Sequence, residues 1–143
     1  MKPDNQSIPA GYEPHFRKSP VTDPWEPLYV RRDNSGLSLG LRIAREHCNG
    51  RGLLHGGVIS TLADNAMGLV CVFGMERSSA LTVGLSVDFL SAGTIGQWLE
   101  VLAVPTKLGR TLAFADAQIV ADGEMIAKAA ATFRIIGIPA KAV

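Results

Sequence analysis

The chain has 143 residues, 47% of them hydrophobic, with 14 lysines and arginines against 13 aspartates and glutamates. This length suits one domain with its own core. The balanced charge lacks the excess of basic residues that is typical of a protein that binds nucleic acid or an anionic membrane. The two cysteines lie in different surroundings, so we expect no disulfide. The sequence shows no basic leader and no apolar run of about 18 residues, so we expect a cytoplasmic protein without a membrane span.

The N-terminal part of the chain differs from the rest in composition. Residues 1–27 hold six of the eight prolines and little apolar periodicity, which predicts an extended arm that can dock on the body but builds no core. From Leu28 the domain proper, residues 28–143, begins with two runs, "LYVRR" and "LSLGLRIA", around an Asn34-Ser35-Gly36 turn. The alternation in these runs predicts a β-hairpin with one buried face.

A helix and four strands are predicted after the hairpin. Apolar residues at steps of three and four predict a helix over residues 57–73, with a stripe made of Ile59, Leu62, Ala66, Leu69 and Phe73. The strand runs are "ALTVGLSVDFLSA", "QWLEVLAVPTKLG", "TLAFADAQIVAD" and "MIAKAAATFRIIG". Their short connections, including an Asp122-Gly123 turn, predict an antiparallel meander. Since only this sheet can cover the helix stripe, we predict an α+β fold, an antiparallel sheet of about five to six strands wrapped around one long central helix.

One acidic residue, Asp64, lies in the middle of this apolar helix. At about 100° per residue it lies far from Leu62 and Ala66, so we expect it to point away from the home sheet. The same face carries small or apolar residues, namely Gly57, Ser60, Thr61, Met67, Gly68 and Cys71. A carboxylate at a partly buried seam can act as a nucleophile or a general base, whereas the ordinary alternative is a solvated helix residue.

Gly56 and Gly57 lie where the helix begins. Free N–H groups at this end favour developing negative charge, and glycine lets a substrate approach the backbone. If the Gly57 amide binds a carbonyl oxygen that Asp64 attacks, both groups must reach one carbon atom. Seven residues of helix separate them by about 10 Å, so the two groups are predicted to come from different copies of the chain.

Three segments resemble the hotdog-fold acyl-CoA thioesterases, in particular the phenylacetate-pathway type and the thioesterase superfamily members. These segments are "CNGRGLLHGGVISTLADNAMG", "LTVGLSVDFLSAG" and "LGRTLAFADAQIV". The resemblance covers residues 28–137, and it is most specific in an Asn six residues before "HGG" and an Asp nine residues after that His. It implies hydrolysis of an acyl-CoA by a homodimer, or a tetramer made of two dimers, with sites at the protomer interface.

The resemblance also implies roles for individual residues. Asp64 would be the nucleophile or the general base, and the Gly57 N–H would polarise the thioester carbonyl. His55 and Asn49 would position the carbonyl or the water, and Thr82 stands where some relatives carry a serine that holds the water.

Basic residues are implied as ligands of the coenzyme A phosphates. The candidates are Lys107 and Arg110 in "TKLGRT", with Arg77 as a further one, and the alternative for each is a solvated surface residue. Coenzyme A is part of the substrate, so neither a cofactor nor a metal is expected.

Other chemistries fit the sequence less well. His47, Cys48 and His55 match no zinc spacing, and no G-x-S-x-G motif indicates a serine hydrolase. His55 could also serve only as a cap of the helix. Two alternatives stay open: an enoyl-CoA hydratase-like enzyme of the same fold, and a non-catalytic acyl-CoA-binding regulator. The regulator would need an effector domain, for which residues 1–27 are too short and proline-rich.

Overall fold

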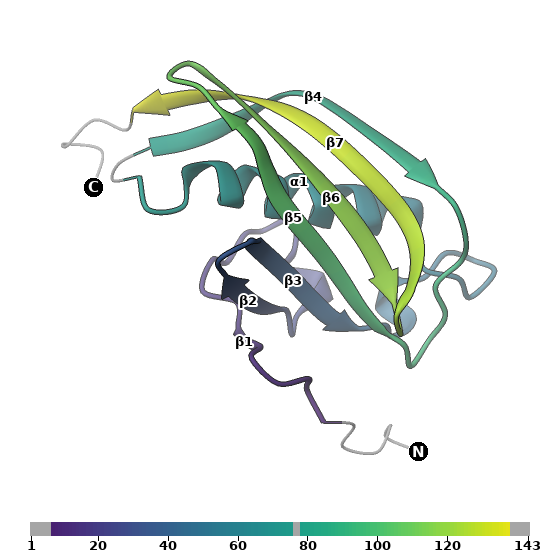
Figure 1. Ribbon diagram of the computed structural model, residues 1–143. Helices are drawn as coiled ribbons and strands as arrows, with labels where there is room; N and C mark the ends of the chain where they lie inside the picture. The colour runs from purple at the N-terminus through teal and green to yellow at the C-terminus, as the bar shows by residue number, and fades with distance from the viewer. Residues whose placement is uncertain (1–6, 76–77, 138–143) are drawn as a thin grey trace.

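A computed structural model describes residues 7–75 and 78–137. In this part of the chain one α-helix, α1 (Gly56–Val72), is covered by a single antiparallel sheet that curls over it (Figure 1). The strands are β1 (Glu13–Pro14), β2 (Tyr29–Asp33), β3 (Gly36–Arg42), β4 (Ser78–Phe89), β5 (Trp98–Leu108), β6 (Leu112–Ala121) and β7 (Glu124–Gly137). Short 3-10 helices, η1 (Asp23–Trp25) and η2 (Arg45–His47), complete the fold. The predicted α+β class, with one helix wrapped by a sheet, is confirmed.

The two tight turns form where the sequence predicts them. Asp33 Oδ1 accepts hydrogen bonds from the N–H groups of Ser35 (2.8 Å) and Gly36 (3.2 Å), which orders the turn between β2 and β3. Between β6 and β7, Asp122 and Gly123 adopt φ values of 46° and 85°, the left-handed pair that joins twisted antiparallel strands. Both hairpins are therefore specified by local turn chemistry.

The position of β4 differs from the predicted meander. The strand order is β1-β2-β3-β5-β6-β7-β4, so β5, β6 and β7 form a meander while β4 pairs with β7 at the edge of the sheet. The connection from Phe89 to Trp98 is too long for a tight hairpin, and β5 pairs instead with β3. One edge of the sheet therefore ends in β4, a strand of 12 residues.

The sheet covers more of the helix than the predicted stripe. Ile59, Leu62 and Ala66 are buried as expected, but Leu69 is only half-buried and Phe73 is exposed. The expectation that Met67 and Cys71 lie on the opposite face is wrong, because both are buried. Five strands, β3 to β7, contact α1, and this curvature encloses more than one side of the helix.

The N-terminal arm docks on the body and contributes to it. β1 pairs with β2 as a seventh strand, beyond the predicted five to six, and the His15 N–H donates to the Leu28 carbonyl (2.9 Å). Contrary to the expectation that the arm builds no core, Tyr12, His15 and Thr22 are buried. The proline-rich composition obscured this contribution, because an irregular segment has no periodicity from which burial can be predicted.

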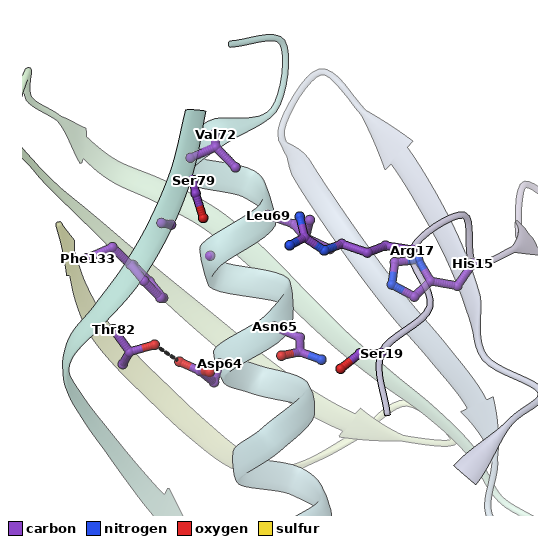
Figure 2. A pocket seen from close by; sticks show the side chains of 12 residues that line it. His15, Arg17, Ser19, Asp64, Asn65, Leu69, Val72, Ser79, Thr82 and Phe133 are labelled. Atoms are coloured by element: carbon purple, nitrogen blue, oxygen red, sulfur yellow. Dashed lines mark hydrogen bonds between the residues drawn. The ribbon is translucent and has the colours of Figure 1, made fainter. Parts of the chain in front are cut away.

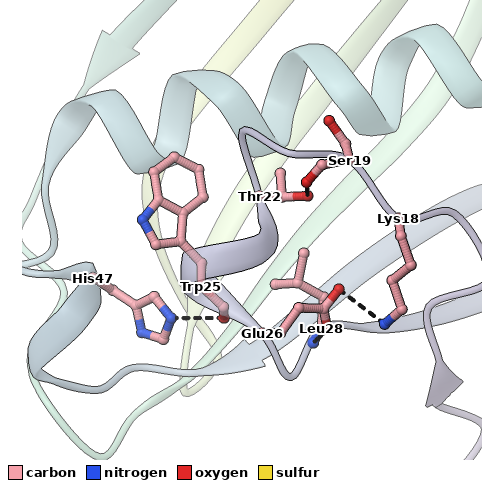
Figure 3. A network of polar contacts seen from close by, with 7 residues as sticks. All are labelled: Lys18, Ser19, Thr22, Trp25, Glu26, Leu28 and His47. Carbon is pink, nitrogen blue, oxygen red and sulfur yellow. Dashed lines mark hydrogen bonds and ion pairs between the residues drawn. The ribbon is translucent and has the colours of Figure 1, made fainter.

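A buried histidine fastens the arm to the loop before α1 (Figure 3). His47 Nδ1 accepts from the Ala44 N–H (2.9 Å), so Nε2 carries the proton and donates to the Trp25 carbonyl (3.0 Å). Lys18 and Glu26 form an ion pair (2.9 Å) farther along the arm. The two hydrogen bonds of its ring explain why His47 is buried, without a metal ion.

We expect His47→Ala to lower the free energy of unfolding by about 2–3 kcal/mol, because the Ala44 amide and the Trp25 carbonyl lose their partner in a buried site. Urea denaturation followed by tryptophan fluorescence measures the change. Arg45→Ala in the same 3-10 helix is the matched control, since Arg45 is exposed, and it should stay within about 0.5 kcal/mol of the parent. Equal stabilities of the two variants would contradict this function of His47.

Candidate active site

Asp64 forms a direct contact with the edge strand of its own sheet. Thr82 Oγ1 on β4 donates a hydrogen bond of 2.6 Å to Asp64 Oδ1, at a cavity of about 160 Å³ (Figure 2). The expectation that Asp64 points away from the home sheet is therefore wrong: the carboxylate is half-buried and faces β4. The resemblance implied a Thr82 hydroxyl that holds a water, and the structure instead shows this hydroxyl bonded directly to Asp64.

A β-bulge in β4 aims Thr82 at the helix. Thr82 pairs with Phe133, but the next pair in register is Gly84 with Thr132, so Val83 is an extra residue. Cross-strand partners share a face of the sheet, and Phe133 is buried on the face that covers α1. Bulges commonly re-aim a side chain beside a functional site. Here the bulge directly follows the residue that binds the carboxylate.

The beginning of α1 has its own polar contact. His55 is the N-cap residue, and its Nδ1 accepts a hydrogen bond of 2.7 Å from the Gly57 N–H. The structure therefore shows His55 as a helix cap, which was the alternative considered from the sequence. A Cβ atom at Gly57 would lie 2.9 Å from His55 Nδ1, and one at Gly56 would lie 3.2 Å from the Phe89 ring. Both positions therefore favour glycine.

Asn49 orders the loop that leads into the helix. Its Oδ1 accepts from the N–H groups of Arg51 (2.9 Å) and Leu53 (3.2 Å). The loop also returns to β-type pairing between Cys48 and Leu54. The side-chain oxygen of Asn49 therefore serves the loop, and the residue lines neither of the two cavities described below.

Four of the five predicted catalytic residues are divided between two cavities, and Asn49 lines neither. Asp64 and Thr82 line the first, whereas His55 and Gly57 line a second cavity near the start of α1. Along the helix axis the seven residues from Gly57 to Asp64 span about 10 Å. One copy of the chain therefore does not bring the predicted amide donor and the carboxylate together.

The basic candidates lie elsewhere. Lys107 is exposed near the end of β5, and Arg110 is exposed in the turn before β6, at the end of the sheet where β4 begins (Figure 1). Neither lines the cavity of Asp64 or that of His55. Arg77 lies outside the described residues.

The described ranges, residues 7–75 and 78–137, contain neither a candidate metal cluster nor a candidate membrane-spanning helix. Within them, no three His, Cys, Asp or Glu side chains are grouped so that they could hold a metal ion. No helix in these ranges is long and apolar enough to cross a membrane.

The arm supplies residues to both cavities, which sequence reasoning missed. His15, Arg17 and Ser19 line the cavity of Asp64, and Trp25 lines that of His55. Burial lowers the pKa of the His15 imidazole, against the opposing effect of Glu26. No periodic pattern marks these positions, and the only signal was the density of polar and aromatic residues in "YEPHFRKS".

Comparison with known proteins decides the family. A family model described as "Thioesterase superfamily" matches residues 51–128, which include α1 and most of the sheet. This chain belongs to the thioesterase superfamily. The thioesterase is 39% identical to a Pseudomonas aeruginosa protein that bears the name of an esterase, over 90% of this chain and 98% of the relative. The family assignment makes it a thioester hydrolase with the hotdog fold.

Two further relatives of the thioesterase carry more specific descriptions. Human acyl-coenzyme A thioesterase 13 is 33% identical over 62% of this chain and 64% of its own length. A Streptococcus mutans protein, solved with bound acetyl-CoA, is 26% identical and superposes with a TM-score of 0.71, covering 80% of this chain and 92% of that one.

Proposed function

We propose that this thioesterase hydrolyses acyl-CoA to a free carboxylic acid and coenzyme A, at sites that two copies of the chain share. The observation that carries the proposal is the half-buried Asp64, oriented by Thr82 in one cavity while the Gly57 amide lies in another. The human acyl-coenzyme A thioesterase and the acetyl-CoA-bound bacterial protein support coenzyme A thioesters as substrates.

In the proposed mechanism, the Gly57 N–H of one copy donates to the thioester oxygen, while Asp64 of the second copy acts on the carbonyl carbon. The Thr82 hydroxyl donates its hydrogen bond to Asp64 Oδ1, which leaves Oδ2 for the reaction. Asp64 either takes a proton from water as the water adds, or adds to the carbon itself before hydrolysis. In the first route the tetrahedral adduct expels the coenzyme A sulfur, which takes the proton that Asp64 accepted from water. In the second route the C–S bond breaks as the thiolate leaves and an acyl anhydride with Asp64 forms. Water then hydrolyses this anhydride to the free acid, and the proton that water releases restores the thiol.

Substrate has to compete with His55 for the amide in this mechanism. His55 Nδ1 accepts the Gly57 N–H at 2.7 Å, so the thioester oxygen replaces the imidazole as acceptor when it binds. The displaced ring and the Asn49 side-chain amide then position the carbonyl or the water. Lys107 and Arg110 are proposed as ligands of the coenzyme A phosphates, because they are exposed at the end of the sheet where β4 begins.

The edge strand β4 is the proposed surface between the two copies. It exposes large apolar side chains, including Leu81 (51%), Val83 (65%) and Phe89 (54%). Its outer edge has no neighbouring strand among the described residues, and such an edge in a soluble protein is usually covered or blunted. Pairing of two β4 strands would cover it and place each α1 beside that of the other copy. Assembly of two such dimers into a tetramer, and a cytoplasmic location, stay predictions.

We expect Leu81→Lys to shift the protein from dimer towards monomer and to lower acyl-CoA hydrolysis with it, because twofold pairing of β4 would bring the two introduced lysines onto one face of the joined sheet, where like charges repel. Size-exclusion chromatography with light scattering measures the mass over a dilution series. Leu112→Lys is the matched control, since Leu112 is also exposed and apolar but lies on β6. A Leu81→Lys variant that stays dimeric and active would place the interface elsewhere.

The proposed function is tested with a panel of saturated, aromatic and unsaturated acyl-CoAs, following release of the free thiol. Hydrolysis of saturated and aromatic members supports the proposal. Water addition to enoyl-CoA without thiol release would instead indicate the hydratase-like alternative. Tight binding of acyl-CoA with neither reaction would indicate the regulatory alternative.

A further inference from the structure

The cavity of Asp64 is bounded on its other side by the N-terminal arm, which places a cation there. Figure 2 shows the Arg17 side chain extending from the arm toward α1, at the level of Leu69. Within the described part of the chain, no carboxylate lies within 4.0 Å of Arg17, whereas the neighbouring Lys18 is paired with Glu26 at 2.9 Å. Arg17 is thus an exposed cation at the cavity wall that has no ion-pair partner among the described residues.

His15 adds a buried imidazole to the wall of the same cavity. The side chain is 5% exposed, and its Nδ1 is buried without a hydrogen-bond partner among the described residues. Because an orphaned buried N–H is rarer than an under-satisfied acceptor, we place the proton of the neutral ring on Nε2. The ring turns toward α1 in Figure 2, so the Nε2–H donor faces the same cavity as the Arg17 guanidinium.

The arm holds these donors in place. The His15 N–H donates to the Leu28 carbonyl at 2.9 Å, and the arm is bound again where His47 donates to the Trp25 carbonyl at 3.0 Å. Arg17 and Ser19 lie between these two attachments. The polar wall of the cavity is consequently part of the folded structure.

On the basis of the proposed acyl-CoA hydrolysis, on which this inference rests, we propose that the cavity binds short dicarboxylic acyl groups, with Arg17 and His15 recognising the terminal carboxylate. Leu69, beside which Arg17 lies, is five residues from Asp64, about 7.5 Å along the helix axis. The two positions also lie about 140° apart around α1, on either side of the face that Asn65 and Gly68 contribute to the cavity, so a short dicarboxylic chain would run obliquely across this face toward the Arg17 side chain. Repulsion by Asp64 keeps the terminal carboxylate away from the reacting end, and Arg17 binds it at the far end. Arg17 is then a specificity-determining residue.

The test compares glutaryl-CoA with an isosteric branched acyl-CoA in which an isopropyl group replaces the carboxylate. We expect the parent enzyme to have the higher kcat/KM for glutaryl-CoA. Arg17→Gln should lower kcat/KM for glutaryl-CoA roughly tenfold or more and leave the branched substrate unchanged. Lys18→Gln is the matched control, because this cation on the same arm is paired outside the cavity, and it should change neither value.

A binding measurement separates failure of this inference from failure of the proposed function. Two thioether analogues, one carboxyl-ended and one isopropyl-ended, bind without reacting and are compared by calorimetry. Preference for the carboxyl-ended analogue that is lost in Arg17→Gln supports the inference even if no thioester is hydrolysed. Equal losses for both analogues would place Arg17 on a coenzyme A phosphate and overturn it. Hydrolysis of the branched substrate with no effect of Arg17→Gln on either substrate would also overturn it, while the proposed function would stand.

Discussion

Replacing Asp64 by asparagine is expected to lower kcat by roughly 10² or more, because the amide can neither add to the carbonyl nor accept a proton from water. The change is nearly isosteric and the amide oxygen can still accept the 2.6 Å hydrogen bond from Thr82, so the fold should be preserved. Affinity for a non-hydrolysable acyl-CoA analogue should change much less than kcat. Thiol-release kinetics, calorimetry and circular dichroism measure these three properties.

Asp116→Asn is the matched control for this experiment. Asp116 is also a carboxylate, but it is exposed on β6 and lies outside both cavities of the candidate site. It should leave hydrolysis unchanged. Near-normal turnover by Asp64→Asn would remove Asp64 from the mechanism, and an equal loss in both variants would indicate a general effect of charge.

Gly57→Pro is expected to lower kcat by about 10²-fold or more, because proline has no N–H to donate to the thioester oxygen. Proline is tolerated in the first turn of a helix, where the Gly57 N–H bonds only the His55 side chain. Gly57→Ala adds a Cβ against His55 but keeps the N–H, so it serves as the control and should lose less activity. Equal losses in the two variants would assign the effect to displacement of His55.

Mixing the inactive Asp64→Asn and Gly57→Pro proteins, after dissociation and reassociation, should restore activity to about a quarter of the parent value. Random pairing makes half of the dimers mixed, and in each mixed dimer one site has both intact residues while the other has neither. A mixture that stays as inactive as its components would show that the amide and the carboxylate of a site belong to one copy. Gly57→Ala mixed with the parent protein should show no such gain.

Local signals in the sequence predicted the elements, but the pairing of distant strands was beyond them. The helix, the Asp33-to-Gly36 turn and the Asp122-Gly123 turn depend on neighbouring residues, and they lie within a residue or two of the predicted positions. The place of β4 beside β7 depends on which strands close the sheet around α1. Periodicity within one strand contains no information on that choice.

The candidate site shows the same division. The family pattern singled out Asp64 and Thr82, but not the direct hydrogen bond between them. The burial of Met67 and Cys71 depends on how far the sheet curls. The hydrogen bond from the Gly57 amide to His55 depends on a side-chain rotamer. The place of Arg17 at the cavity was missed because it depends on where an irregular arm crosses the helix.

The arm, which is attached at Leu28 and at His47, is a separate stretch of chain from the helix that carries Asp64. Choice of substrate and the hydrolytic step can therefore evolve separately in this enzyme. In the proposed site, the residues that would contact the acyl end lie on the arm, whereas Asp64, the proposed nucleophile or base, lies on α1. Substitutions between positions 15 and 19 can therefore change which metabolite is accepted while the hydrolytic step is inherited intact. Descendants of one ancestor could diversify through this stretch alone.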